Sequence, residues 1–100
     1  MKLIWAPRAI ARASEIAAHI ALDRPGAAAK WVDAVFAAVA TLKAHPRCGR
    51  AVPEINRPKV RELLYGAYRI ICRQDPGRVV VLTIRHARRD WDPAELVAED

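Results

Sequence analysis

Arginine supplies most of the side chains suited to bind a charged partner, and these residues gather in one part of the chain. Residues 47–89 hold eleven basic and three acidic side chains, and ten of the eleven cations are arginine. Residues 1–46 have a net charge of +3, and residues 90–100 have a net charge of −5. A guanidinium group donates two parallel hydrogen bonds to a phosphate or a carboxylate. The pattern therefore predicts a cationic surface for an acidic or phosphate-bearing partner.

Cysteine and histidine do not indicate a second kind of site. Cys48 and Cys72 are too few for a disulfide framework, so both are expected to be free thiols. The Cys and His residues lack metal-ligand spacing, and we predict neither a metal nor a cofactor. No apolar run approaches the roughly 18 residues of a membrane span, and the N-terminus lacks the apolar segment of a signal peptide. We therefore expect a cytoplasmic protein that does not contact a membrane.

The hydrophobic pattern predicts that the arginines lie on a small sheet. Alternation with a period of two marks strands at 59–64, 67–74 and 79–86, and the turn signals between them are short. Residues 2–5 form a further strand at or beside a sheet edge. Helical spacing predicts two helices, over 7–22 and 27–44, which the short link makes an antiparallel hairpin. Residues 47–57 are expected to form a loop.

This β-α-α-β-β-β order predicts an α+β fold, with the helix hairpin on one face of a mainly antiparallel sheet. The length fits one domain over residues 1–91, followed by an acidic tail over 92–100. Trp5, Trp31 and Phe36 are expected in the core. Strand alternation predicts the side chains under the helices to be Tyr68, Ile70, Cys72, Val80, Leu82 and Ile84. It leaves Arg69, Arg73 and Arg85 on the open face.

An ordered set of short motifs resembles the RelE/ParE superfamily of toxins. The motifs are Asp23-Arg24-Pro25, Ala27-Ala28, Trp31-Val32, His45-Pro46, Gly49-Arg50, Val52-Pro53-Glu54, Val60-Arg61-Glu62-Leu63, Tyr68-Arg69-Ile70 and residues 79–86. The resemblance covers residues 1 to about 91. It implies a toxin of a type II toxin–antitoxin module that inhibits growth, forms a hetero-oligomer with a cognate antitoxin and is neutralised by it.

Two activities occur among proteins of this resemblance, and the shared fold does not separate them. RelE-like members cut mRNA in the ribosomal A site without a metal, whereas ParE-like members poison DNA gyrase and are not nucleases. Whether this chain is an enzyme therefore stays open. A third hypothesis, motivated by the cationic segment, is a DNA-binding or scaffolding module without toxicity, but no recognition helix or stacking motif supports it.

For the nuclease alternative, three residues match positions that carry catalytic groups in YoeB-type members. The resemblance implies Glu54 as a base, Arg69 as a phosphate clamp and His86 as an acid. Against this, no tyrosine follows Tyr68, and the basic segment contains only one lysine. Strict alternation also places His86 on the helix-covered face. We therefore predict a ParE-like gyrase poison of the plasmid-stabilisation type, with the ribosome-dependent mRNA endonuclease as the alternative.

Six arginines are predicted to contact the target or the antitoxin: Arg61, Arg69, Arg73, Arg85, Arg88 and Arg89. Structural roles are also open for some of these residues and their neighbours. Glu54 would pair with Arg61 or Arg50 and fix the loop. Arg61 and Glu62 would form exposed cross-strand ion pairs, which contribute little to stability. His86 would be a hydrogen-bonded residue at the end of its strand.

Overall fold

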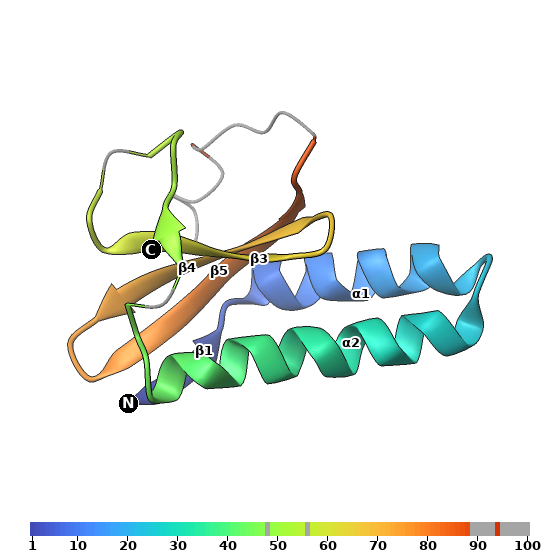
Figure 1. Ribbon diagram of the computed structural model, residues 1–100, viewed down its shortest axis with the longest axis horizontal. Helices are drawn as coiled ribbons and strands as arrows, with labels where there is room; N and C mark the ends of the chain where they lie inside the picture. The colour runs from blue at the N-terminus through green and yellow to red at the C-terminus, as the bar shows by residue number, and fades with distance from the viewer. Residues whose placement is uncertain (48, 56, 89–93, 95–100) are drawn as a thin grey trace.

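The computed structural model describes residues 1–47, 49–55, 57–88 and 94, and these contain two long helices packed on a five-stranded sheet (Figure 1). The elements follow the chain as β1 Lys2–Trp5, α1 Pro7–Ala21, α2 Pro25–Ala40, the short 3₁₀ helix η1 Thr41–Lys43, β2 Arg50–Ala51, β3 Val60–Tyr65, β4 Tyr68–Asp75 and β5 Arg78–His86. No helix in this described part is long and apolar enough to cross a bilayer.

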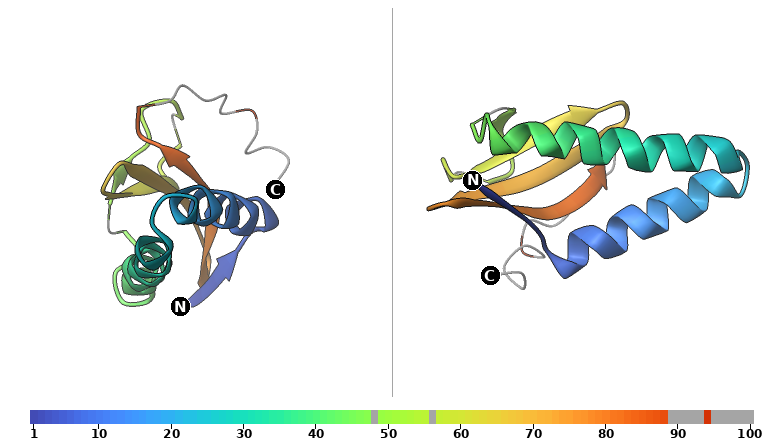
Figure 2. Two further views of the ribbon diagram at one scale, coloured as in Figure 1. Left: turned by 90° about the vertical axis from the view of Figure 1, so that its right-hand side faces the viewer. Right: turned by 90° about the horizontal axis from the view of Figure 1, so that it is seen from below.

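The sheet has the strand order β1-β5-β4-β3-β2. β1 lies parallel to β5, and all other neighbours are antiparallel. Both helices lie on the same face of the sheet, and their hairpin extends past the ends of the strands (Figure 2). The predicted α+β fold with a helix hairpin on one face, and the predicted edge position of residues 2–5, are therefore confirmed.

Proline sets the start of both helices. Pro7 and Pro25 occupy the first helical turn, where the missing N–H would have had no intrahelical partner. α2 therefore begins two residues before the predicted start at residue 27. Its α-helical part ends at Ala40, and the last predicted turn is the tighter η1. The link between the helices is residues 22–24, as short as the hairpin prediction required.

The main core lies between the helices and the sheet. Its buried residues are Ala9, Trp31, Val35, Val39, Leu42, Ile70, Cys72, Val79, Val81 and Ile84. Trp31 lies in this core as predicted, and Trp5 packs at its border. The prediction is wrong for Phe36, which is 50% exposed because the helix turns it away from the inward stripe. Its ring packs instead against Trp5, with centroids 4.8 Å apart.

An irregularity in the pairing of β4 and β5 changes which face several side chains occupy. Ile71 pairs with Thr83, whereas Cys72 pairs with Val81, so Leu82 is an extra residue on β5. Val80, which precedes the bulge, and Leu82, the extra residue, both point away from the helices. The prediction that these two residues lie under the helices is therefore wrong. It is right for Ile84 and for the predicted residues of β4.

A second, smaller core lies on the opposite face of the sheet. Its buried residues are Ala6, Val52, Val60, Ile71, Val80 and Leu82, and Ile4 and Ile55 pack against them. The segment from β2 to residue 55 covers this cluster, on the side of the sheet opposite the helices (Figure 1). The predicted loop over 47–57 thus contains a short strand, and the face expected to be open is partly covered.

Cys72 provides a test of the main core. Burial raises the pKa of its thiol to about 12, so the reactive thiolate is scarce at neutral pH. In a Cys48→Ser background, we expect iodoacetamide to modify native Cys72 at least about tenfold more slowly than the urea-unfolded chain. Mass spectrometry over time measures this difference. Equal rates in the two states would show that the core is open to the reagent.

Candidate functional site

Arg69 lies on β4 between two carboxylates and is almost fully buried, with a side-chain exposure of 7%. Its Nη1 and Nη2 atoms each donate a hydrogen bond of 2.6 Å to a different carboxylate oxygen of Glu54. Its Nε and Nη2 atoms donate to Oε1 of Glu62 at 2.9 and 2.7 Å. The guanidinium group is therefore held on both sides by protein carboxylates.

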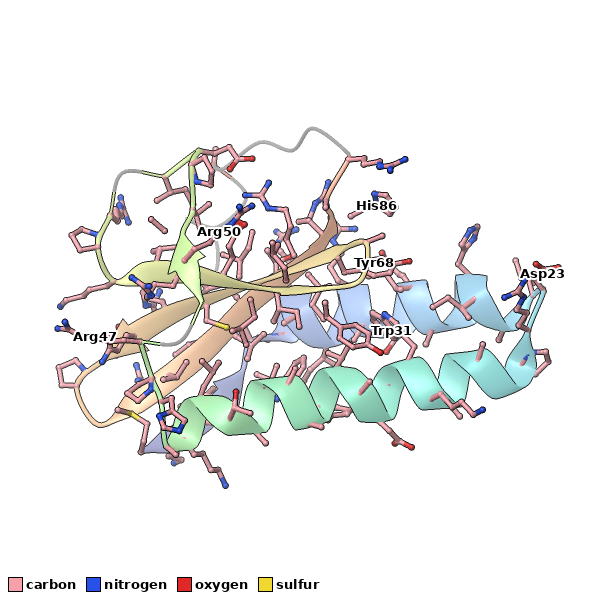
Figure 3. All side chains as sticks on the ribbon, in the orientation of Figure 1. Asp23, Trp31, Arg47, Arg50, Tyr68 and His86 are labelled. Carbon is pink, nitrogen blue, oxygen red and sulfur yellow. The ribbon has the colours of Figure 1, made fainter. Side chains whose placement is uncertain are left out.

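Glu62 is the most enclosed member of this group, with a side-chain exposure of 0%. It lies on β3 opposite Ile71, facing the second core. Its Oε2 atom also accepts hydrogen bonds of 3.2 Å from Nε and Nη2 of Arg50, its partner across β2 and β3. Figure 3 shows Arg50 over this side of the sheet. We call Arg50, Glu54, Glu62 and Arg69 the arginine–glutamate cluster.

The cluster compensates its own charges, with two cations and two anions. The hydrogen bonds that Arg69 donates to Glu54 raise the pKa of Arg69 above its usual range, an effect that burial opposes and Glu62 reinforces. Arg69 is therefore charged at every pH at which the protein is folded. Its bonds to Glu54 fix the segment after β2, and its bonds to Glu62 fix that segment to the sheet.

The structure brings two of the three predicted nuclease residues together and leaves His86 apart from them. Glu54 and Arg69 contact each other on the face away from the helices. His86 ends β5 and pairs with Tyr68, whose ring it meets edge-on at 5.5 Å between centroids. It lies on the helix side, as strict alternation predicted, and lines a groove of about 590 Å³ beside α1 (Figure 3).

His86 is held in one orientation by the chain that follows it. Its Nδ1 atom accepts a hydrogen bond of 3.1 Å from the backbone N–H of Arg88. The predicted alternative of a hydrogen-bonded residue at a strand end agrees with this contact.

The remaining predicted arginines do not form one continuous face. Arg73 binds Asp75 at 3.0 Å through Nε, and this contact lowers the pKa of the carboxyl group. Arg61 pairs with Cys72 across the sheet, which places it on the helix side, and its Nη2 donates to the carbonyl of Gly49 at 2.7 Å. Arg85 lies opposite Arg69 and borders the groove beside α1. Arg88 follows β5, and Arg89 lies outside the described residues.

Sequence reasoning missed the role of Glu62 and the partner of Glu54. Glu62 was expected in an exposed cross-strand ion pair. It does pair across the strands, with Arg50 and Arg69, but the expected exposure is wrong because its side chain is buried. Alternation with Val60 was a usable signal, because it places Glu62 on the face of the second core. Glu54 does fix the loop, but through Arg69 and not through Arg61 or Arg50.

A two-helix hairpin on this five-stranded sheet is an architecture also found in bacterial toxin–antitoxin proteins. A solved structure from the chromosomal ParDE toxin–antitoxin system of P. aeruginosa matches 88% of this chain and 97% of its own, with a TM-score of 0.73 and 25% identity. The protein “Putative toxin Y4kP” of Sinorhizobium fredii (strain NBRC 101917 / NGR234) is 36% identical over 92 residues, which is 90% of this chain and 92% of that protein.

The family model for the ParE toxin of the type II toxin–antitoxin system parDE matches residues 3–91. The chain therefore belongs to the ParE toxin family. This confirms the predicted superfamily and its ParE branch, and it implies a cognate antitoxin as a partner.

Proposed function

We propose that this toxin inhibits growth by poisoning DNA gyrase, and that a cognate antitoxin neutralises it. One observation carries the choice of target: Arg69 is bound to Glu54 and Glu62, and His86 lies on the opposite face of the sheet. The groups that an mRNA endonuclease would need are thus paired with each other or separated. A toxin that acts by binding its target does not need them.

The chemistry of RNA cleavage explains why this arrangement favours a binding toxin. Cleavage requires a base at the 2′-hydroxyl, cations around the transition-state phosphate and an acid at the leaving oxygen. Both carboxylate oxygens of Glu54 accept hydrogen bonds from Arg69. The candidate base and the candidate phosphate clamp therefore neutralise each other's charge instead of facing a substrate. Freeing Arg69 for a phosphate would break a buried ion pair, which costs about 3–5 kcal/mol.

The antitoxin is proposed to use arginines outside the arginine–glutamate cluster. Arg61, Arg73, Arg85, Arg88 and Arg89 remain the candidates from the sequence, since Arg69 has too little exposed surface to contact a partner. The guanidinium group of an arginine can donate two parallel hydrogen bonds to each carboxylate of an acidic antitoxin segment.

Purified toxin added to DNA gyrase tests the proposal. We expect reduced supercoiling, or an accumulation of cleaved plasmid, at micromolar toxin. We also expect mRNA on translating ribosomes to stay intact. His86→Ala is expected to change gyrase inhibition by less than about twofold, because His86 is half-buried at the end of its strand and is not among the residues proposed to contact a partner.

Circular dichroism of the His86→Ala protein provides the control for folding. Codon-phased mRNA cuts by the wild-type toxin, lost in folded His86→Ala, would contradict the proposal and identify the endonuclease. Unchanged gyrase activity at micromolar toxin would also contradict it.

A further inference from the structure

A second groove, of about 550 Å³, lies at the end of the sheet away from His86. Three cations from separate positions in the sequence line it: Arg47 after η1, Lys59 before β3, and Arg61 within β3. The turn between β4 and β5 closes one side, through Pro76 and Gly77. Figure 3 shows Arg47 beside this turn, with His86 at the opposite end of the sheet. We call this site the basic groove.

The cations of the basic groove are not compensated by carboxylates of the described chain. Among the residues that the structure describes, Arg47 and Lys59 form no ion pair, and neither donates a side-chain hydrogen bond. Arg61 donates only to the neutral carbonyl of Gly49, and its buried Nε has no acceptor. This contrasts with the arginine–glutamate cluster, where each guanidinium has a carboxylate.

Asp75 is the acidic residue that lines the basic groove, and it is already bound. Arg73 donates to it at 3.0 and 3.1 Å through Nε and Nη2, and Nε of Arg78 lies 3.5 Å from its Oδ2. Two arginines therefore balance this one carboxylate. Asp75 therefore does not reduce the positive charge that Arg47, Lys59 and Arg61 present to a ligand.

We propose that the basic groove binds the sugar–phosphate backbone of DNA. Lys59 extends the β3 ladder by one residue, since its carbonyl accepts the N–H of Gln74 at 2.8 Å. Lys59 and Arg61 are therefore about 6.8 Å apart along an extended chain, on the same face. A DNA strand presents one phosphate per about 3.4 Å of its axis, so two phosphates fall within this span.

The backbone at this edge favours DNA over an acidic peptide. A peptide captured here would need a strand with which to pair, and the neighbouring edge strand β2 has only two residues. Phosphates need only cationic side chains that reach them from a surface. With gyrase as the target, the basic groove would give the toxin a contact with the DNA that gyrase holds. This last step, and not DNA binding itself, rests on the proposed function.

Direct binding of a short fluorescent DNA duplex, measured by anisotropy without gyrase, tests the basic groove. Arg47→Ala/Lys59→Ala is expected to weaken binding by about tenfold and to lower the slope of log affinity against log salt by about 2. The matched control is Arg24→Ala/Lys30→Ala, which removes one arginine and one lysine from exposed positions in the helix hairpin. We expect this control to bind within about twofold of the wild type.

Three outcomes would overturn the inference. The groove variant could bind the duplex as tightly as the wild type, or the control variant could lose as much duplex affinity as the groove variant. The groove variant could also lose affinity for a polyglutamate peptide while its affinity for the duplex is unchanged. Thermal unfolding confirms that both variants fold. Because gyrase is absent, the result is independent of the target. A toxin that binds DNA through the groove but leaves gyrase active would refute the proposed function alone.

Discussion

Arg69→Met is expected to lower the free energy of unfolding by about 3–5 kcal/mol, the usual cost of removing one partner from a buried ion pair. The variant would leave Glu62, whose side chain has no exposed surface, with Arg50 as its only remaining cation in the cluster. Arg50 is 58% exposed and cannot replace the enclosed guanidinium. Urea unfolding followed by circular dichroism measures the change.

Two further variants separate burial from charge in this result. Arg73→Met, on the same strand, removes an outer ion pair with Asp75 and is expected to cost about 1 kcal/mol or less. Arg69→Met/Glu62→Leu removes both buried charges, and we expect it to recover most of the loss. An Arg69→Met protein as stable as the wild type, or a double variant with simply additive losses, would contradict a buried and coupled pair.

Gly49→Ala is expected to cost at least about 2 kcal/mol, because strain and a backbone clash occur together. Gly49 has a φ of 95°, where side chains are unfavourable. A Cβ atom there would lie 2.2 Å from the carbonyl oxygen of Glu62. Because backbone atoms cannot move aside cheaply, β2 would separate from β3, and the bond from Arg61 to Gly49 would be lost.

Gly77→Ala is the matched control for this substitution. Gly77 has a φ of 74°, and a Cβ there would meet no atom within 4 Å, so only the conformational cost of about 1 kcal/mol remains. Urea unfolding of both variants gives the difference. If the two substitutions cost the same, the close approach of Gly49 to β3 does not contribute to stability.

The helices, the four longer strands and their arrangement follow from periodicity and turn chemistry. Pro7, Pro25 and the short links leave few alternatives for a chain of this length. The bulge at Leu82 was not predictable, because one extra residue in a strand leaves the hydrophobic character of Val80 and Leu82 unchanged and alters only their face. β2 was missed because two residues carry no periodic signal.

The arginine–glutamate cluster shows a similar limit for the site. Alternation correctly placed Arg69 on the face away from the helices, together with Arg73 and Arg85. It does not indicate which carboxylate a loop brings to that face, and Glu54 lies 15 positions away in the sequence. The predicted cationic surface is therefore interrupted, because Arg69 is bound to Glu54 and Glu62. Among the described residues, the basic groove brings together three cations that bind no carboxylate.

The most direct test of the structural role of Arg69 is gyrase-dependent DNA cleavage by Arg69→Met/Glu62→Leu, after circular dichroism has shown that the variant is folded. A structural role predicts cleavage within about threefold of the wild type, since the reacting groups are on gyrase. A folded variant that has lost activity would contradict this account, as would a wild-type toxin that cuts mRNA and leaves DNA intact.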